Sequence, residues 1–540
     1  MKTIKGIIID VINRRQFPGE LTVKNGRIAN ISDCDDVPDV YILPGFVDSH
    51  IHIESSMLVP SEFARLAVQH GTVATVSDPH EIANVCGMEG VRFMIDNGRS
   101  VPLKFFFGAP SCVPATVFET SGARIDVQDV AALLDRDDIP YLAEMMNWPG
   151  VLNRDEEVMA KIGCALDRGK PVDGHAPGLR GSDAVKYASA GISTDHECFS
   201  RDEALDKIRA GMKIAIREGS AAKNYNALIG LMREYAGSIM FCSDDKHPDD
   251  LLEGHINVLA ARTLKLGYNL YDVLHSCCVL PVQHYNLNVG LLQKGDPADF
   301  IVTDNPETMH VLQTWIDGEC VYDNGKVMFT TGKIAPINRF NARNCEPSDF
   351  DVNADMLEQP VIVAYDGELI TGRRMEKLHS ENGKVLADPE RDILKIAVVN
   401  RYMKAAPAAA FIKNFGIRDG AIASSVAHDS HNIIVVGSSD EYMSRAVNLI
   451  MRAKGGISAV TNGSSEILPL PVAGIMSDRP GEEVATAFKK LNRMAREMGS
   501  DLKSPYMLIS FMALLVIPSL KISDLGLFDA DQFRLLNAQA

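Results

Sequence analysis

The chain has 540 residues, of which 46% are hydrophobic and 23% are charged, and this composition is typical of a globular protein with two or three cores. Its formal net charge of −17 at pH 7 argues against a nucleic-acid partner or an anionic membrane, because both require a basic surface. Ten cysteines without a C-x-x-C pair predict reduced thiols in a cytoplasmic protein and no disulfide framework.

The first elements expected along the chain are short β-strands. Residues 1–43 carry strand-like patterns with a turn at Asn25-Gly26. A second β-rich stretch covers residues 289–328. Because neither piece is long enough to fold alone, we expect residues 1–43 and 286–340 to pair in one small β-sandwich-like domain.

The segment between these pieces, residues 44–285, alternates short apolar runs with helix-like patterns. Eight such units in about 220 residues predict an α/β fold with a (β/α)8 TIM-like barrel. A doubly wound open sheet is the competing layout. The expected strands are residues 45–52, 72–77, 103–108, 141–145, 172–175, 192–196, 213–217 and 239–244.

The pattern changes after residue 345, where we expect a separate α+β domain over residues 345–540. Its longest apolar run, residues 505–520, is shorter than a membrane span and contains Pro518, so we expect a buried helix there and no membrane partner. The other expected elements are strands at 360–367, 393–400 and 431–437 and a helix at 481–498.

Metal-binding residue types gather where the barrel strands are expected to end. His50 and His52 are two residues apart in the run YILPGFVDSHIHIESS, so a strand places both side chains on one face. Functional residues of such barrels collect at the carboxyl ends of the strands. Four more candidates lie at later strand ends: Glu144, His175, His196 and Asp244.

Four histidines and two carboxylates exceed the needs of one four-coordinate ion, so we infer two metal ions that share a bridging carboxylate. Taken singly, Glu144 could belong to an ion pair and Asp244 could cap a helix, but six such residues at strand ends favour a metal centre. Two close cations can deprotonate a water to a nucleophilic hydroxide. Asp244 is suited to take its proton and pass it to a leaving group.

Longer motifs add a resemblance to a known family. The chain contains IHIESSM, SDPHEIANVCG, GAPSCVPAT, EMMNWPGV, DGHAPGL, TDHEC, REGSAAKN and CSDDKHPDDL, and later VAHDSHNIIVVG and FMALLVIPSLKISDLGLFD. With the segment GLLQKGDPADFIV, this ordered set resembles the amidohydrolase superfamily and, within it, the bacterial-type adenine deaminases. The resemblance covers nearly the whole chain.

The resemblance implies hydrolysis of adenine to hypoxanthine and ammonia, a reaction of purine salvage, by a metal-activated hydroxide that attacks C6. It implies two divalent ions, with Mn²⁺ or Fe²⁺ favoured over Zn²⁺, and a homodimer or higher homo-oligomer. Glu144 matches a position where many relatives carry a carboxylated lysine, and Glu81 is a rival for the bridge. The ligand positions that match are His50, His52, His175, His196 and Asp244.

The residues that bind the purine are less clearly marked. A second acid is needed at a ring nitrogen, for which Glu81 and Glu218 are candidates by position. Arg217, Glu218 and Ser220 follow the seventh strand and could contact the purine, or they form a polar turn that Ser220 caps. His80 is expected to support the ligands or to be structural, as is His247.

Two further readings stay open. In 428-HDSHN-432, we expect Asp429 and Ser430 to set a turn, because no third metal ligand is evident beside the two histidines. The function could instead be that of another amidohydrolase, acting on a cyclic amide or an N-acyl amine, or that of a non-catalytic purine-binding scaffold. The intact ligand set argues against the scaffold.

Overall fold

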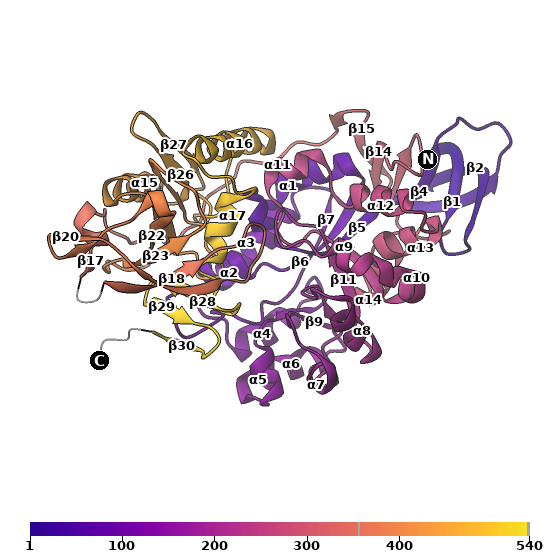
Figure 1. Cartoon of the computed structure of the whole chain (residues 1–540). Helices are drawn as coiled ribbons and strands as arrows, with labels where there is room; N and C mark the ends of the chain where they lie inside the picture. Colours follow the sequence, from indigo (N-terminus) through magenta and orange to yellow (C-terminus); the bar gives the residue numbers. More distant parts are fainter. Residues whose placement is uncertain (355–356, 537–540) are drawn as a thin grey trace.

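The structure is a computed structural model that describes residues 1–354 and 357–536. An N-terminal sheet, a central part with parallel strands and a C-terminal part make up a mixed α/β molecule (Figure 1). Residues 355–356 and 537–540, which belong to the domain expected at 345–540, lie outside the described residues. Each of the ten cysteines is described and free, as the sequence predicts.

The N-terminal sheet has eight strands in the order β16-β15-β14-β13-β4-β1-β2-β3. Strand β4 pairs in parallel with β1 and antiparallel with β13, so the two β-rich pieces of chain meet in this sheet. Asn25 and Gly26 have φ angles of 53° and 75°, which are the left-handed values that a tight hairpin turn needs. The strands are β1 (Lys2–Asp10), β2 (Arg15–Lys24), β3 (Arg27–Asp33), β4 (Tyr41–Pro44), β13 (Phe300–Thr303), β14 (Val311–Ile316), β15 (Glu319–Asp323) and β16 (Lys326–Val327).

The central part contains the eight expected strands, each within the range that the sequence predicts. Their apolar side chains are buried on both faces, as in parallel sheets covered by helices, except in β7, where Phe105 and Phe106 are half-buried. The strands are β5 (Phe46–Ile51), β6 (Thr72–Ser77), β7 (Lys104–Phe107), β8 (Leu142–Met145), β9 (Val172–Gly174), β10 (Thr194–Asp195), β11 (Lys213–Arg217) and β12 (Ile239–Cys242).

These strands pair in parallel and in chain order, as β5-β6-β7, β8-β9 and β10-β11-β12. Single parallel bridges connect the three groups at Ala109–Leu142 and at Val172–Ile192. A third bridge joins Ile51 to Asp244, so the chain after the last strand returns to the first. The carboxyl ends of the strands therefore lie at one end of the central part.

Helices follow the central strands and bury apolar side chains against them; in α2 every residue is buried. In α6 the buried residues are Val158, Lys161, Ile162 and Ala165, which is the spacing of a helix stripe. The helices are α1 (Pro60–Ala67), α2 (His80–Cys86), α3 (Met88–Gly98), α4 (Val127–Leu134), α5 (Trp148–Leu152), α6 (Glu156–Leu166), α7 (Gly181–Ser189), α8 (Arg201–Arg209), α9 (Tyr225–Leu228), α10 (Met232–Tyr235), α11 (Pro248–Glu253), α12 (Ile256–Lys265), α13 (Leu270–Leu274) and α14 (Leu280–Tyr285).

The C-terminal part is built on a second eight-stranded sheet, in the order β19-β18-β23-β22-β25-β24-β26-β27. The three strands and the helix expected there are present as β18, β22, β25 and α16. The larger elements are β18 (Glu358–Val363), β19 (Gly372–Lys377), β22 (Ile393–Val399), β23 (Ala408–Lys413), β24 (Ala421–Ser424), β25 (Ile433–Gly437), β26 (Gly456–Val460), β27 (Ser465–Pro469), β28 (Leu520–Ser523), β29 (Gly526–Asp529), α15 (Asp440–Ala453), α16 (Gly481–Glu497) and α17 (Pro505–Phe511).

The apolar run at 505–520 is buried as expected, but only its first part is helical. Helix α17 ends at Phe511, and turns lead from there to β28. Within the described residues, the longest apolar helices fall short of what a bilayer crossing needs. The apolar run at 505–520 therefore forms part of the hydrophobic interior of the C-terminal part.

The C-terminal part packs against the central part. Helix α16 contacts α1 and α11, and α16 and α17 lie beside the central part in Figure 1. The amide of Ser477 donates to the carbonyl of Met57 at 2.8 Å. This contact places C-terminal residues close to the carboxyl ends of the parallel strands.

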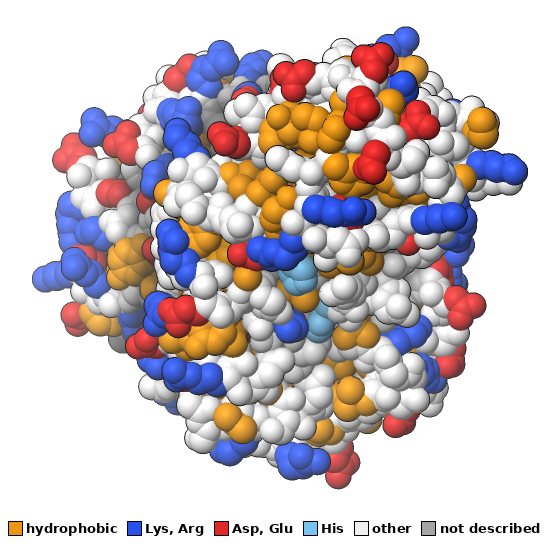
Figure 2. Space-filling view, turned by 90° about the vertical axis from the view of Figure 1, so that its right-hand side faces the viewer, with side chains coloured by type: hydrophobic (Ala, Val, Ile, Leu, Met, Phe, Trp, Pro, Cys, Tyr) orange, Lys and Arg blue, Asp and Glu red, His pale blue; other side chains and the backbone are white. Residues whose placement is uncertain are grey.

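Figure 2 views the molecule from the side on which the N-terminal sheet lies. Among the side chains drawn in colour on this face, Lys and Arg are interspersed with Asp and Glu and form no continuous basic stripe.

Gly174, in β9 directly before His175, lies where the strands leave little room for a side chain. A Cβ atom at Gly174 would lie 2.4 Å from the carbonyl oxygen of Thr194 and 2.8 Å from the side chain of Ile192. We expect Gly174→Ala to lower the free energy of unfolding by about 1–3 kcal/mol, because overpacking forces the backbone to shift.

The matched control is Gly163→Ala in α6, where a Cβ atom meets no atom within 4 Å. This variant should be neutral or up to about 1 kcal/mol more stable, because alanine favours a helix over glycine. Urea unfolding followed by circular dichroism measures both effects. Equal stability of the two variants would contradict the packing described for β9.

Candidate active site

The first half of the site gathers around the end of β5. The Nε2 atoms of His50 and His52 lie 3.2 Å apart. Oδ1 of Asp244, which follows β12, lies 3.6 Å from Nε2 of His50 and 3.3 Å from Nε2 of His52. All three side chains are buried, so three potential metal ligands converge on one point inside the protein.

Glu144, in β8, connects this group with a second one. Its Oε1 lies 3.5 Å from Nε2 of His52. Its Oε2 lies 2.9 Å from Nδ1 of His175 and 3.2 Å from Nε2 of His196. The structure thus brings all six predicted ligand residues together, with the Glu144 carboxylate between the two groups of histidines.

The hydrogen bonds of these donors fit divalent cations. Nδ1 of His52 lies 3.2 Å from the carbonyl oxygen of Asp78, so it carries a proton. Burial lowers the pKa of His52, but the hydrogen bond to Asp244 outweighs it and raises that pKa well above its usual value, and a cation bound at Nε2 would take the place of the second proton. The Nε2 atoms of His52 and His50 lie close together, a contact that a cation between them would relieve. Two nitrogens bound to one ion at about 2.1 Å lie roughly 3.4 Å apart, close to the separations observed.

The rings of His50 and His175 each turn one nitrogen toward this cluster, Nε2 of His50 and Nδ1 of His175. Among the described residues, the other nitrogen of each ring is buried and has no hydrogen-bond partner. A set of imidazoles and carboxylates without thiolates suits Mn²⁺, Fe²⁺ or Zn²⁺. The site can therefore hold divalent metal ions.

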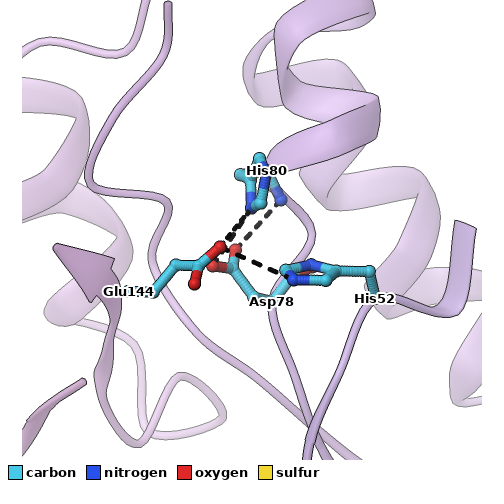
Figure 3. Close-up of side chains that lie close together, drawn as sticks. All are labelled: His52, Asp78, His80 and Glu144. Carbon is cyan, nitrogen blue, oxygen red and sulfur yellow. Dashed lines mark hydrogen bonds and ion pairs between the residues drawn. The ribbon is translucent and has the colours of Figure 1, made fainter. Parts of the chain in front are cut away.

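His80, at the start of α2, lies inside the site. Figure 3 shows its ring beside Asp78, Glu144 and His52. Its Nδ1 atom is 3.2 Å from Oδ2 of Asp78 and 3.6 Å from Oε1 of Glu144. Burial lowers the pKa of His80, but the charges of Asp78 and Glu81 outweigh it and raise the pKa well above its usual value, which favours an imidazolium.

Arg217, at the end of β11, binds Oδ2 of Asp244, whereas Oδ1 of Asp244 faces His50 and His52. Its fully buried guanidinium donates to Oδ2 of Asp244 at 2.7 Å, to Oε2 of Glu197 at 3.0 Å and to the carbonyl of Ala222 at 2.6 Å. Burial raises the pKa of Asp244, but the charge of Arg217 outweighs it and holds that pKa well below its usual range. Asp244 is therefore a carboxylate.

Glu197 is a site residue that the sequence analysis did not single out. Its Oε1 lies 3.5 Å from Nε2 of His196 and 3.7 Å from Nδ1 of His175. It follows His196 directly in TDHEC, and β10 ends at Asp195. The alternation of strand side chains therefore no longer applies there, and pattern alone does not place Glu197.

The residues expected to contact the purine do not all line the central cavity. Arg217 lines the central cavity, but its nitrogens already bind two carboxylates. Glu218 accepts from Arg262 at 3.1 Å, and Ser220 donates to Asp250 at 2.5 Å; neither side chain lines the cavity. The structure therefore separates Glu218 and Ser220 from the metal-type ligands.

His247 also lies away from these ligands. Its ring packs against Phe488, with ring centroids 4.6 Å apart, and it does not line the central cavity. Burial lowers its pKa to about 4, which fits a neutral structural histidine between the central and C-terminal parts.

Comparison with known proteins identifies the family. The model of the amidohydrolase family matches residues 41–321, and the model of the adenine deaminase C-terminal domain matches residues 368–534. An adenine deaminase of Salinibacter ruber is 53% identical over 537 residues, which are 99% of this chain and 98% of that one. The chain belongs to the adenine deaminase family.

Other members agree over the same length. An adenine deaminase of Methanosarcina mazei is 52% identical over 99% of both chains. One of Borreliella burgdorferi is 49% identical over 98% of both. The family resemblance drawn from the motifs is thereby confirmed.

The C-terminal domain that characterises the family reaches the site at Glu81. Oε1 of Glu81 accepts from Nδ1 of His428, and Oε2 accepts from Nε2 of His431. Burial raises the pKa of Glu81, but these imidazoles and that of His80 outweigh it and hold the pKa well below its usual value. The segment 428-HDSHN-432, expected only to form a turn, thus supplies two side chains to the site.

The site encloses a small cavity of about 30 Å³, room for one or two waters. Residues of the C-terminal domain complete its wall, among them apolar Leu369, Phe511 and Leu514. The remaining lining residues are His52, His80, Glu81, Glu144, Met146, His175, His196, Glu197, Arg217, Asp244, Asp245, His428 and Asp429.

Removal of the Arg217 charge should be costly. In Arg217→Met, Asp244 and Glu197 lose the cation between them, so we expect a loss of about 3–5 kcal/mol in the free energy of unfolding. Arg217→Lys keeps the charge but lacks the planar fork and should lose less. Adding Glu197→Gln to Arg217→Met should recover part of the loss. Unchanged stability of Arg217→Met in urea unfolding would contradict this account.

Proposed function

We propose that the chain hydrolyses adenine to hypoxanthine and ammonia. The observation that carries this proposal is the near-full-length likeness, at 49–53% identity, to proteins named adenine deaminase. The intact set of four histidines and two carboxylates adds support, because a non-catalytic scaffold has no need to keep it.

We further infer a closed (β/α)8 barrel over residues 44–285. The chain-order pairing of the strands and the bridge from Asp244 back to Ile51 support it. We propose residues 1–43 and 286–340 as one flanking domain and residues 345–540 as the C-terminal domain. The matched ranges of 41–321 and 368–534 are compatible with this division.

For the metals, we propose two groups of ligands that share Glu144. His50, His52 and Asp244 form one group, and His175 and His196 form the other. The position of Glu144 between the groups supports it as the bridge, while both oxygens of Glu81 accept hydrogen bonds from histidines. We favour Mn²⁺ or Fe²⁺ over Zn²⁺. Two such ions, when bound, would lower the pKa of a water enough for it to lose a proton at neutral pH.

The protein groups then move the protons. Asp244, kept ionised and oriented by Arg217, accepts a proton from the attacking water and gives it to the amino group that leaves C6 as ammonia. His80, held among carboxylates, is the group that can donate a proton to a ring nitrogen, and it regains a proton when the oxygen on C6 loses its own as the carbonyl of hypoxanthine forms. Glu81 enters the reaction as a carboxylate, so its role is to accept a hydrogen bond from a purine N–H.

The surroundings of the reaction are part of the proposal. The wall that the C-terminal domain contributes keeps bulk water away from the ligand residues, which strengthens each electrostatic contact made there. We propose adenine as the small-molecule substrate, a cytoplasmic location and assembly as a homodimer or higher homo-oligomer. The acidic net charge of the chain supports neither nucleic acid nor membrane as a partner.

The reaction itself is the first test. After chelation, the purified protein should release little ammonia from adenine, and added Mn²⁺ or Fe²⁺ should restore release at least tenfold, with hypoxanthine formed in equal amount. An enzymatic ammonia assay and chromatography measure both products. A metal-loaded protein that is inactive on adenine but hydrolyses hydantoin or an N-acyl amine would overturn the proposed substrate.

Glu144 and Glu81 are the two candidates for the carboxylate that bridges the metal ions, and the metal content of their variants distinguishes them. Glu144→Gln should reduce bound metal to one equivalent or fewer, because the amide is neutral and binds cations weakly. Glu81→Gln, the matched control, should keep two equivalents while its turnover of adenine falls. Elemental analysis after dialysis gives the metal content. The reverse pattern would assign the bridge to Glu81.

A further inference from the structure

Both oxygens of the Glu81 carboxylate accept hydrogen bonds from side chains that are distant in sequence. His428 and His431 lie 347 and 350 residues away along the chain. All three side chains are buried, with at most 4% of each residue exposed. A buried carboxylate needs such donors, because moving its charge from water into the protein interior without hydrogen-bond partners costs free energy.

The hydrogen bonds around His431 fix which of its nitrogens carries the proton. The backbone N–H of Ala427 donates to Nδ1 of His431 at 3.2 Å. Nδ1 is therefore an acceptor, and the proton is on Nε2, which faces Glu81. The backbone amide of His431 also donates to the carbonyl of Ala427 at 2.7 Å, so the ring is held at its own turn.

His428 is anchored from another direction. Its backbone N–H donates to Oγ of Ser510 at 3.2 Å, and its ring packs against Phe511 with centroids 5.5 Å apart; both residues belong to α17. Its Nδ1 atom donates to Glu81, and its Nε2 atom lies 3.9 Å from Oδ1 of Asp245. The ring therefore lies between two carboxylates, hydrogen-bonded to Glu81 and in a longer ionic contact with Asp245.

Glu81 lines the central cavity, so its orientation matters for a bound base. Each carboxylate oxygen has two lone pairs, and each histidine uses one of them. Nε2 of His80 lies 3.6 Å from Oε1 of Glu81, and the lone pairs that no histidine uses can accept from a ligand, in a direction that His428 and His431 set. A glutamate held in this way has already lost the rotamer freedom that binding would otherwise cost.

We propose that His428 and His431 are positioning residues that hold Glu81 in the geometry required for adenine turnover. This inference rests on the proposed function and gives the C-terminal domain a direct part in it. The histidines act through Glu81; they are not metal ligands and need not touch the purine.

The test uses the full-length, metal-loaded protein and a pair of substitutions at each histidine. Asparagine places an N–H donor near the position of Nδ1, and glutamine places one near Nε2, so His428→Asn and His431→Gln preserve the bonds to Glu81. His428→Leu and His431→Leu remove them at similar volume. We expect each leucine variant to lose 10–100-fold in kcat, as for other groups that orient a functional side chain, and the amide variants to lose less.

A double-mutant cycle with Glu81→Gln decides whether the histidines act through Glu81. The variant Glu81→Gln/His431→Leu should have the kcat of Glu81→Gln alone, because the second change removes a group whose target is already altered. The same should hold for His428→Leu. Losses that multiply in the double variants would overturn the proposal.

Three controls keep the result interpretable. Metal content and the urea midpoint, measured for every variant, separate loss of positioning from loss of metal or fold. His379→Leu, at an exposed histidine of the C-terminal domain, should have the wild-type kcat. Ammonia release by the wild-type protein tests the proposed function separately, and a leucine variant that keeps the wild-type kcat overturns the positioning role alone.

Discussion

The Glu144 carboxylate accepts a hydrogen bond from His175 on one side and lies 3.5 Å from Nε2 of His52 on the other. This one buried anion brings together the ends of strands from opposite halves of the central part. Around it lie more carboxylates than an uncharged interior tolerates, and each needs a positive partner. Arg217 is the partner of Asp244, and His428 is the partner of Glu81. The remaining negative charge and the convergent imidazole lone pairs suit two divalent cations.

Below these ligands, a second layer of polar groups fixes the strands that carry them. Asp48, in β5, accepts from the backbone of Ser243 at 3.0 Å and lies 2.8 Å from Nε2 of His255, so it ties the first strand to the chain after the last. Asp173, in β9, is bound by Tyr285 and Thr194 at 2.8 and 2.7 Å. Such supporting bonds hold metal ligands in place and are needed for their geometry.

Local patterns in the sequence were enough to locate the eight strands and to single out six candidate metal ligands that the structure brings together, because strand alternation and strand ends are properties of short segments. Arg217, the last residue of β11, lines the cavity, whereas Glu218, just past the strand, accepts from Arg262 and does not line it; alternation ends with the strand and does not predict this difference. The contacts of His428 and His431 with Glu81 join segments about 350 residues apart. They depend on how the C-terminal domain packs on the central part, and no short-range pattern contains that information.

The apolar side chains of Leu369, Phe511 and Leu514 leave a cavity of only about 30 Å³ beside the ligands, which is far smaller than a bicyclic base. A bicyclic base fits beside the ligands only if these apolar side chains give way, and Phe511 packs on the ring of His428 with centroids 5.5 Å apart. The layer that must yield to a base is therefore also the layer that anchors one of the two histidines on Glu81, so entry of the base and orientation of Glu81 are coupled through Phe511.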